Sequence, residues 1–513
     1  MPDTPVGATP LASSSPLNLL FITTDQQRWD SLPCYGREFM RTPNLDRLAR
    51  EGTVFERAYT PAPLCVPMRA AMMTGQWPAT LGILGNNHWF PSASTTDAVG
   101  QNVAGGVPVW PEAATAAGYR TAAIGKMHFT PWDARMGFIE RISAEDKRQY
   151  FWPDDYSKFL SANGIEKHHP TTLPGYAEHL QASVFPHPKR FHVDAYVGDQ
   201  AASWLSRYSG TGGSAGRNGG QNPPFAAWVS FPGPHDPYDP PEEMASMYYD
   251  APIPEPIPPP SPAQEHGGGG RGGAVRTSPL YQLDLSRATP EHYRRWRAHY
   301  YANISLIDEG IGKILAALEE TGALEHTIII FTSDHGDALG DHGMAYKSFF
   351  YEWSAHVPLI VRGPGVTCGG RSASLISTLD MVPLIYRTCG VEAPPTVQGI
   401  DPAPVLQDPS ITLRTHVYSE LQGRAMVRDE RFKYVHYKER ACELYDLQED
   451  PTEEHNLAAD DASTNDVARL RGLLVEHALD NASCRATAAQ QEPAWHRSWA
   501  FHYDSPMAQS VLS

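Results

Sequence analysis

The pair of residues best suited to chemistry in this sequence is a cysteine and an arginine four positions apart. The run Cys65-Val-Pro-Met-Arg69 continues through Ala-Ala-Met-Met to Thr74-Gly75. The proline favours extended backbone, whereas Arg-Ala-Ala-Met-Met favours a helix, so Cys65 is expected just before a helix start. Backbone N–H groups at a helix start attract anions, and Arg69 adds a positive charge. The run therefore predicts an anion site beside a thiol, and a buried structural cysteine is the alternative.

A lysine and a histidine form a second pair. Lys126 and His128 end the run Gly118-Tyr-Arg-Thr-Ala-Ala-Ile-Gly-Lys126-Met-His128. In an extended segment, side chains two residues apart share one face, so the ammonium and the imidazole are expected to point the same way. A polar loop that begins with a glycine is the alternative interpretation.

Acidic residues follow two strongly apolar runs. Asp25-Gln26 comes after LNLLFITT, and Asp334-His335 comes after TIIIFTS. In parallel sheets, ligands bind beyond the carboxyl ends of the strands, where both pairs would lie. Carboxylate and amide oxygens suit Ca²⁺ or Mg²⁺, and the histidine leaves Mn²⁺ open. Acidic residues after strands are also common turn formers, but two pairs on one sheet edge favour a metal site.

Two more residues complete the candidate site. Lys347 lies in the glycine-containing stretch that follows Asp334-His335. His235 lies in a proline-stiffened turn after the apolar run 225–231. A lone histidine in a turn is usually structural, but its place after a central strand makes His235 a candidate general acid.

Together these residues resemble the sulfatase family of the alkaline phosphatase-like fold. Cys65-x-Pro-x-Arg69 matches the first sulfatase signature, and residues 118–128 match the second, GY-x-T-x-x-x-GK-x-H. The resemblance spans residues 18–358 and resumes at 444–457. It implies that a formylglycine-generating oxidase converts Cys65 to formylglycine, whose hydrated aldehyde is the nucleophile. It also implies a divalent metal, with Ca²⁺ preferred and Mg²⁺ or Mn²⁺ as alternatives.

The resemblance assigns roles to individual positions. The implied catalytic residues are Cys65, Arg69, Lys126, His128, His235 and Lys347. The implied metal ligands are Asp25, Gln26, Asp334, His335 and the modified Cys65. Asn86 is expected to touch the substrate, with Asn87 as the competing choice, and Trp89 is expected to form an apolar or cation-binding wall. His356 stands where relatives often have arginine, which is interpreted as a changed supporting contact.

The expected reaction is hydrolysis of a sulfate monoester of the aryl or alkyl (choline) type. Gln26, His335 and the run 125–129 resemble choline sulfatase in particular. A phosphonate monoester or phosphodiester hydrolase with the same machinery is the alternative, although those hydrolases typically lack the residues that match Lys126 and His128. An inactive sulfatase-like scaffold that binds a partner is the alternative from another functional class.

The pattern of apolar runs predicts the elements that position these residues. Short, continuously apolar strands alternate with helices, which is typical of a mostly parallel α/β sheet flanked by helices. The predicted strands of this sheet are 17–24, 120–124, 225–231, 327–333 and 358–361, and the predicted helices are 42–52, 110–117, 300–320 and 379–388. From about residue 410, short strands followed by one helix predict a smaller antiparallel sheet. The expected units are a tail (1–16), a catalytic domain (17–405), an α+β domain (406–484) and a second tail (485–513).

The composition argues against several functional classes. Lysine and arginine number 41 against 58 aspartates and glutamates, a net charge of −17, which argues against nucleic-acid binding. No apolar run reaches the roughly 18 residues of a membrane helix. Six scattered cysteines and an N-terminus without a signal-like pattern predict a cytoplasmic protein. The aromatic residues of the 485–513 tail predict docking onto a surface, such as that of a second copy in a homo-oligomer.

Overall fold

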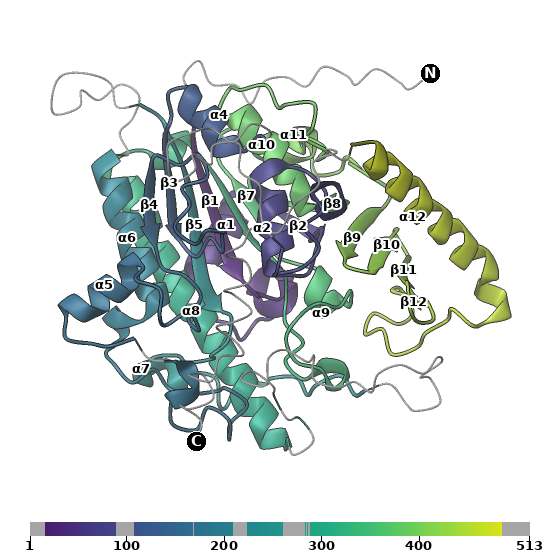
Figure 1. Ribbon diagram of the computed structural model, residues 1–513, viewed down its shortest axis with the longest axis horizontal. Coiled ribbons are helices and arrows are strands. Elements are labelled where there is room, and N and C mark those ends of the chain that lie inside the picture. Colours follow the sequence, from purple (N-terminus) through teal and green to yellow (C-terminus); the bar gives the residue numbers. More distant parts are fainter. Residues whose placement is uncertain are drawn as a thin grey trace.

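The computed structural model describes residues 16–88, 107–167, 169–208, 223–259, 283, 285 and 288–484. An eight-stranded sheet with strand order β4-β3-β5-β1-β6-β7-β2-β8 forms its centre (Figure 1). The strands are β1 (Asn18–Asp25), β2 (Thr53–Tyr59), β3 (Arg120–Gly125), β4 (Glu140–Ser143), β5 (Phe225–Pro234), β6 (Thr327–Ser333), β7 (Leu359–Arg362) and β8 (Gly370–Ser377). Most neighbouring strands are parallel, whereas β7 runs antiparallel to β6 and β2.

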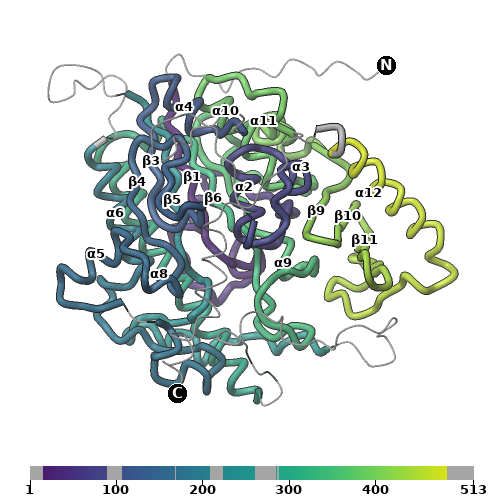
Figure 2. Tube along the Cα trace, in the orientation of Figure 1, coloured from purple at the N-terminus to yellow at the C-terminus, as the bar shows by residue number. Residues whose placement is uncertain are grey.

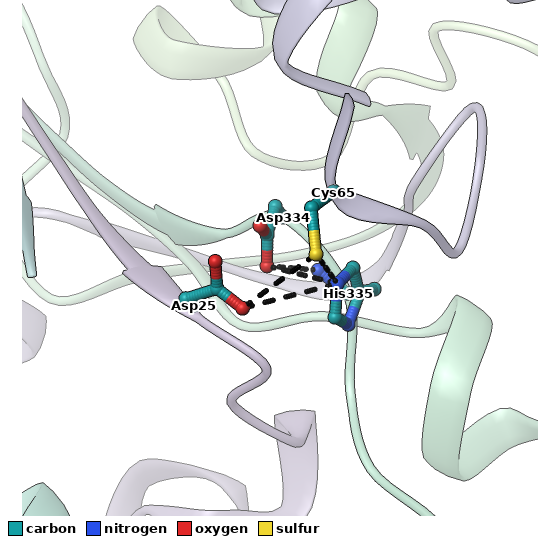
Figure 3. Close-up of side chains that lie close together, drawn as sticks. All are labelled: Asp25, Cys65, Asp334 and His335. Atoms are coloured by element: carbon teal, nitrogen blue, oxygen red, sulfur yellow. Dashed lines mark hydrogen bonds and ion pairs between the residues drawn. The ribbon is translucent and has the colours of Figure 1, made fainter. Parts of the chain in front are cut away.

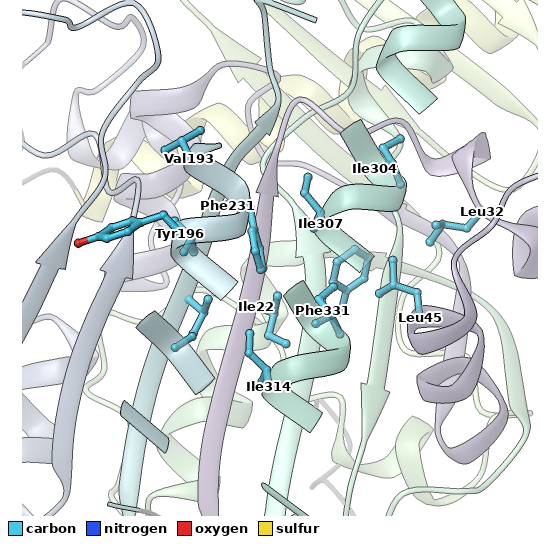
Figure 4. Close-up of a cluster of buried hydrophobic side chains, with 14 of the residues drawn as sticks. Ile22, Leu32, Leu45, Val193, Tyr196, Phe231, Ile304, Ile307, Ile314 and Phe331 are labelled. Carbon is cyan, nitrogen blue, oxygen red and sulfur yellow. The ribbon is translucent and has the colours of Figure 1, made fainter. Parts of the chain in front are cut away.

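Helices cover both faces of this sheet because its central strands are apolar on both sides. The helices α1 (Pro43–Glu51), α6 (Val193–Tyr208) and α8 (Pro290–Glu320) pack on one face. Figure 4 shows Ile307 and Ile314 of α8 against Ile22 of β1 and Phe331 of β6. Full burial of such a side chain stabilises the fold by about 1.5–3 kcal/mol.

The opposite face of the sheet carries the helix that begins at Cys65. The helices α2 (Cys65–Thr74), α4 (Trp110–Ala116) and α10 (Met381–Thr388) share a second core with the other side of β1 and β6. Met68 and Met72 of α2 belong to this core together with Phe21. The remaining helices are α3 (Pro78–Leu81), α5 (Asp155–Ala162), α7 (Glu242–Ala245), α9 (Glu352–Ala355), α11 (Ala403–Gln407) and α12 (Thr464–Cys484).

A separate four-stranded antiparallel sheet lies beside the large one, with strand order β12-β11-β10-β9. Its strands are β9 (Val417–Leu421), β10 (Arg424–Arg428), β11 (Phe432–Tyr437) and β12 (Glu443–Asp446). Leu470 and Leu474 of α12 cover one face, and Figure 2 shows α12 running alongside these strands. The other face meets the large sheet, where Met426 packs with Tyr59 of β2.

The predicted fold class is confirmed: a large, mostly parallel sheet with helices on both faces stands beside a small antiparallel sheet with one helix. Two details differ from the sequence analysis. The predicted helix 300–320 begins ten residues earlier, where Thr289 caps its first turn ahead of Pro290. The predicted strand 358–361 is β7, which runs antiparallel to β6 and β2.

Some predictions fall on residues outside the described part of the chain. These are the substrate contact at Trp89, most of the N-terminal tail, and the aromatic tail with its predicted role in homo-oligomers. Within the described residues, none of the helices combines the length and the apolar character that a membrane crossing requires. Cys34, Cys65, Cys368, Cys389 and Cys442 are free thiols.

Candidate active site

The two acidic pairs meet at one edge of the large sheet. Asp25 is the last residue of β1, and Asp334 directly follows β6. These strands are parallel neighbours with Thr24 opposite Ser333, so the two carboxylates emerge side by side. Figure 3 shows Cys65 and His335 pointing at the same spot, and ligand atoms from Asp25, Cys65, Asp334 and His335 all lie within 4.8 Å of one another.

Cys65 is the first residue of α2 and is fully buried, slightly inside the helix rather than just before it. Its Sγ lies 3.2 Å from Nε2 of His335 and 3.9 Å from Oδ1 of Asp25. Burial raises the pKa of the Cys65 thiol, but the charges of Lys347 and His335 and hydrogen bonds from His128 and His235 outweigh burial and hold this pKa well below its ordinary value. The sulfur therefore occupies a position that stabilises a negatively charged nucleophile.

Two fully buried cations lie beside the carboxylates. Arg69 is one helical turn after Cys65, and its Nη2 lies 3.1 Å from Asp25 Oδ2 and 3.2 Å from Asp334 Oδ2. The Nζ of Lys126 lies 2.7 Å from Asp25 Oδ2 and 3.0 Å from Asp146 Oδ2. Burial lowers the pKa of Lys126, but Asp146 and Asp25 raise it above the ordinary value, so the lysine stays charged. Buried cations of this kind are suited to holding an anion.

The backbone that carries Lys126 and His128 differs from the extended segment that was predicted. Strand β3 ends at Gly125, which has a φ of 98°, and His128 has a φ of 56°, so the segment turns rather than staying extended. The turn is held by the buried Glu145, whose Oε2 accepts a hydrogen bond of 3.0 Å from the His128 backbone N–H. The lysine nevertheless reaches Asp25, and the His128 side chain contributes to lowering the pKa of the Cys65 thiol.

His235 follows β5 and is 1% exposed. Its Nδ1 donates to the backbone carbonyl of Asp236 at 2.9 Å, which fixes the proton of a neutral ring on Nδ1. Its Nε2 lies 3.1 Å from Nη2 of Arg148, which itself holds both carboxylate oxygens of Asp146. Because Nδ1 is occupied by the Asp236 carbonyl, Nε2 is the nitrogen available to the site, where His235 helps to lower the pKa of the Cys65 thiol.

Lys347 and Gln26 form the remaining wall. The Nζ of Lys347 donates to Oε1 of Gln26, and Nε2 of Gln26 donates to Oδ2 of Asp337 at 2.6 Å. Tyr238 also donates to this carboxylate oxygen at 2.6 Å. The Gln26 backbone adopts a left-handed φ of 73°, supported by its N–H bond to Asp334 Oδ1 at 3.0 Å. The amide is thus anchored beside the four-residue cluster, with its oxygen turned to Lys347.

The donor set fits a divalent cation. Asp334 Oδ2 is buried and has the Arg69 ion pair at 3.2 Å but no hydrogen bond, and burial and the nearby Asp25 raise the Asp334 pKa above its ordinary value. Nδ1 of His335 donates to the carbonyl of Gly336 at 3.0 Å, so in the neutral ring the lone pair is on Nε2, which is directed into the cluster at 3.2 Å from the Cys65 Sγ. Metal-binding histidines commonly show this arrangement. Two carboxylates with one imidazole suit Ca²⁺, Mg²⁺ or Mn²⁺.

The sequence analysis missed three side chains that hold the site together: the buried Asp146 and Asp337 and the half-buried Arg148. Asp146 and Arg148 stand in the run Glu-Asp-Lys-Arg after β4, which resembles a solvated charge run. Only their position opposite Lys126 and His235, about 20 and 90 residues away, reveals their contacts. Asp337 lies two residues beyond His335, in a stretch already marked as part of the site.

Two other predicted positions lie around this centre. Asn86 is exposed, and its Oδ1 accepts a hydrogen bond of 3.0 Å from the backbone N–H of Val66, so it caps the helix start beside Cys65. His356 bonds to Glu352 through Nδ1 at 3.0 Å and stacks between Trp29 and Tyr59. It thus contacts supporting residues rather than the four-residue cluster.

Comparisons with known proteins cover nearly the whole chain. The family profile described as "Sulfatase" matches residues 17–391, and one described as "N-sulphoglucosamine sulphohydrolase, C-terminal" matches residues 340–480. A choline-sulfatase of Rhizobium meliloti (strain 1021) is 31% identical over 464 residues, which cover 88% of this chain and 84% of that protein. An arylsulfatase of Clostridium perfringens is 29% identical, with 90% of this chain and 94% of that protein covered.

Solved structures share the fold. A phosphonate monoester hydrolase of Agrobacterium radiobacter superposes with a TM-score of 0.69 at 25% identity, covering 91% of this chain and 96% of that one. A phosphonate monoester hydrolase of Silicibacter pomeroyi superposes with a TM-score of 0.75 at 23% identity, with the same coverage.

Proposed function

The chain belongs to the sulfatase family, and we propose that it hydrolyses an aryl or alkyl (choline-type) sulfate monoester to a phenol or alcohol and inorganic sulfate. The observation that carries this proposal is the convergence of Cys65, Asp25, Asp334 and His335 within 4.8 Å, in contact with two buried cations. This convergence brings together a nucleophile position, a metal-binding donor set and positive charge for the sulfate oxygens.

Two groups absent from the sequence as encoded would complete the site. Conversion of Cys65 to formylglycine would supply a hydroxyl nucleophile from its hydrated aldehyde, in the position that the sulfur occupies here. A divalent cation, Ca²⁺ by preference, would be held by Asp25, Asp334 and His335, with Gln26 as a further ligand, and would make that hydroxyl more acidic. Two-step covalent catalysis replaces one difficult hydrolysis by two easier displacements.

The chain's own residues then bind the ester and move its protons. Lys126 and Lys347 bind sulfate oxygens, and Arg69 orients the group at position 65. His235, protonated on both ring nitrogens, donates the Nε2 proton to the oxygen of the departing alcohol as its bond to sulfur breaks, and the ring keeps its proton on Nδ1. His128 removes the proton from the second hydroxyl so that the aldehyde re-forms and sulfate is released. Removing one preorganised cation or donor typically costs about 10²–10³ in rate.

The second candidate function is hydrolysis of a phosphonate monoester or phosphodiester. The similarity to the phosphonate monoester hydrolase of Agrobacterium radiobacter supports it, because phosphate and sulfate esters share tetrahedral geometry. The contacts of Lys126 with Asp25 and of His128 with Cys65 favour sulfate, because phosphonate monoester hydrolases typically lack this pair.

The proposal includes a maturation partner. A formylglycine-generating oxidase must act on Cys65, which is fully buried in the folded chain, so the oxidation is expected before or during folding. The cytoplasmic location inferred from the scattered cysteines remains a prediction.

The test is a substrate panel assayed with the oxidase-treated protein. Aryl, choline and sugar sulfates are compared with an aryl phosphonate, and a sulfate ester is expected to give the highest kcat/KM. Cys65→Ala should abolish turnover while the thermal melt stays close to that of the wild type. Cys389→Ala, which removes another buried free thiol, is the matched control and should keep activity. Full activity in Cys65→Ala would refute the proposal.

A further inference from the structure

One buried side chain connects the two ends of the loop that follows β6. The amide of Gln26 contacts Asp337 near the start of this loop and Lys347 at its end. A backbone hydrogen bond of 2.7 Å from the Ala338 N–H to the Tyr346 carbonyl closes the same loop. The Gln26 amide therefore holds both ends of the loop beside the last residue of β1.

The chemistry of its two partners permits only one orientation of the Gln26 amide. An ammonium has only donors, so Lys347 requires the oxygen Oε1, whereas an ionised carboxylate has only acceptors, so Asp337 requires the NH₂ group. Nζ of Lys347 donates to Oε1, and Nε2 of Gln26 donates to Oδ2 of Asp337 at 2.6 Å. A rotation of the amide by half a turn would make both contacts repulsive. The oxygen is therefore fixed on the side of Lys347.

Asp337 is itself fixed in place. It is fully buried, and both of its oxygens accept further hydrogen bonds, at 2.6 Å from the Tyr238 hydroxyl to Oδ2 and at 3.2 Å from the Leu339 backbone N–H to Oδ1. Burial, together with the charge of Asp337, raises the pKa of Tyr238 well above its ordinary value, so the tyrosine remains a donor. The carboxylate thus presents a stationary acceptor to the Gln26 NH₂ group.

The backbone of Gln26 is held in a conformation that glutamine rarely adopts. Its φ of 73° lies in the left-handed region, which costs a residue other than glycine about 1–3 kcal/mol. Its N–H donates to Oδ1 of Asp334 at 3.0 Å, and its carbonyl accepts from the Tyr300 hydroxyl at 2.9 Å. Strain of this kind persists where the surroundings enforce it and is common at ligand-binding positions.

The fixed amide oxygen lies beside the four-residue cluster. Gln26 directly follows Asp25, and the Lys347 that contacts its oxygen also acts on Cys65, where its charge lowers the pKa of the thiol against the effect of burial. An amide oxygen has two lone pairs, so Oε1 can accept from Lys347 and still bind a cation.

We propose that Asp337 is a positioning residue for the divalent cation: it accepts the NH₂ group of Gln26 and thereby keeps Oε1 available as a metal ligand. This inference rests on the proposed function, which assigns Gln26 to the metal site. Partners that orient a metal ligand typically contribute about 10–100-fold to metal affinity. Because Asp337 acts through Gln26, its contribution should disappear when the glutamine is absent.

The test is a double-mutant cycle on the full-length, chelator-treated protein. Calorimetry measures binding of Ca²⁺ or Mn²⁺, whichever the wild type binds more tightly. Asp337→Asn, which keeps the shape of the side chain, and Gln26→Ala should each weaken binding by at least about tenfold. The double variant should bind no more weakly than Gln26→Ala alone. Losses that add in the double variant would overturn the proposal, because an effect of charge or of folding at Asp337 does not require Gln26.

A matched control removes a carboxylate that has other partners. Asp30 forms ion pairs with Arg28 and Arg37, at 2.8 and 2.6 Å. Asp30→Asn therefore changes the net charge as Asp337→Asn does and should leave metal affinity unchanged. An equal loss of affinity in Asp30→Asn and Asp337→Asn would assign the effect to net charge and overturn the proposal.

Two outcomes separate this inference from the proposed function. A wild-type protein that binds neither ion would contradict the metal site of the proposed function and this inference with it. Wild-type binding that Asp337→Asn leaves unchanged would overturn this inference alone. If Asp337→Asn does not fold, as a melting curve would show, Asp337→Glu replaces it in the cycle, because the added methylene displaces the carboxylate and keeps its charge.

Discussion

Two buried clusters of this protein each join two carboxylates to a cation, but only one of them also presents donor atoms to a thiol and an imidazole. Between the small and large sheets, Nζ of Lys433 lies 2.7 Å from Glu352 Oε1 and 2.6 Å from Glu453 Oε1. In the active site, Asp25 and Asp334 have Arg69 at one side and open towards Cys65 and His335 at the other. The lysine makes the first pair a structural element, whereas the second pair keeps donor atoms for an external ion.

The pKa values of the acids in the two clusters differ as well. Burial and the charge of Asp25 together raise the Asp334 pKa above its ordinary value. In the other cluster, burial raises the pKa of Glu453 to about 7 against the opposing effect of Lys433. Burial also raises the pKa of Glu352, but Lys433, His356 and Arg428 together outweigh burial and hold this pKa well below its ordinary value. The Asp25–Asp334 pair stays costly although Arg69 contacts both carboxylates, and this cost is what a bound metal would offset.

The largest effects are expected when one charged residue is removed from each cluster. Asp334→Asn should lower both the amount of bound metal and kcat/KM by at least about a hundredfold. The metal-free variant should keep or gain stability, because one of two neighbouring like charges is removed.

Lys433→Met should leave metal content intact but reduce the free energy of unfolding by about 3–5 kcal/mol, because two buried acids lose their partner. Elemental analysis and urea unfolding measure both effects. Equal losses of stability in the two variants would contradict the distinction.

A smaller effect is expected when Arg148, which lies beside His235, is replaced. Arg148→Gln removes the guanidinium that lies 3.1 Å from Nε2 of His235, the nitrogen assigned to leaving-group protonation. The rate on an alkyl sulfate, a poor leaving group, should fall about tenfold, within the range of general acid catalysis, and the rate on a nitrophenyl sulfate should change little. Arg135→Gln, at an exposed position in the same region, is the control. A uniform loss on both substrates would exclude Arg148 from positioning His235.

The smallest expected effect is the contribution of Glu453 to the pH dependence of the free energy of unfolding. Its folded pKa of about 7 lies above the ordinary glutamate value of 4.5, so the folded state binds the extra proton between these two pH values. The stabilising contribution is fully present below about pH 4.5 and is lost as pH rises through 7, with a slope of at most about 1.4 kcal/mol per pH unit. Unfolding of wild type and Glu453→Gln between pH 5 and 8 measures it. Identical pH slopes for the two proteins would contradict the assignment.

The sequence predicted those features that local patterns determine. Residues 327–333 form β6 as predicted, because a continuous β-branched run bounded by a helix and an aspartate has few alternatives. Asp25, Asp334 and Cys65 were grouped correctly because strand ends and helix starts converge on one edge of a parallel sheet.

Other features depend on contacts that the sequence does not encode locally. Asp146 and Arg148 acquire their contacts only when the segment after β4 folds over Lys126 and His235. The turn at His128 depends on Glu145, and the antiparallel direction of β7 is seen only in its pairing with β6.

The most direct test of the proposed chemistry is the state of residue 65 in relation to turnover. Preparations made with and without a formylglycine-generating oxidase are digested, and the fraction of the Cys65 peptide that is ~18 Da lighter, as loss of the thiol to an aldehyde requires, is measured by mass spectrometry. We expect kcat on an aryl sulfate to rise in proportion to this fraction and to extrapolate to zero at zero conversion. Full turnover by a preparation whose residue 65 is entirely cysteine would contradict the account.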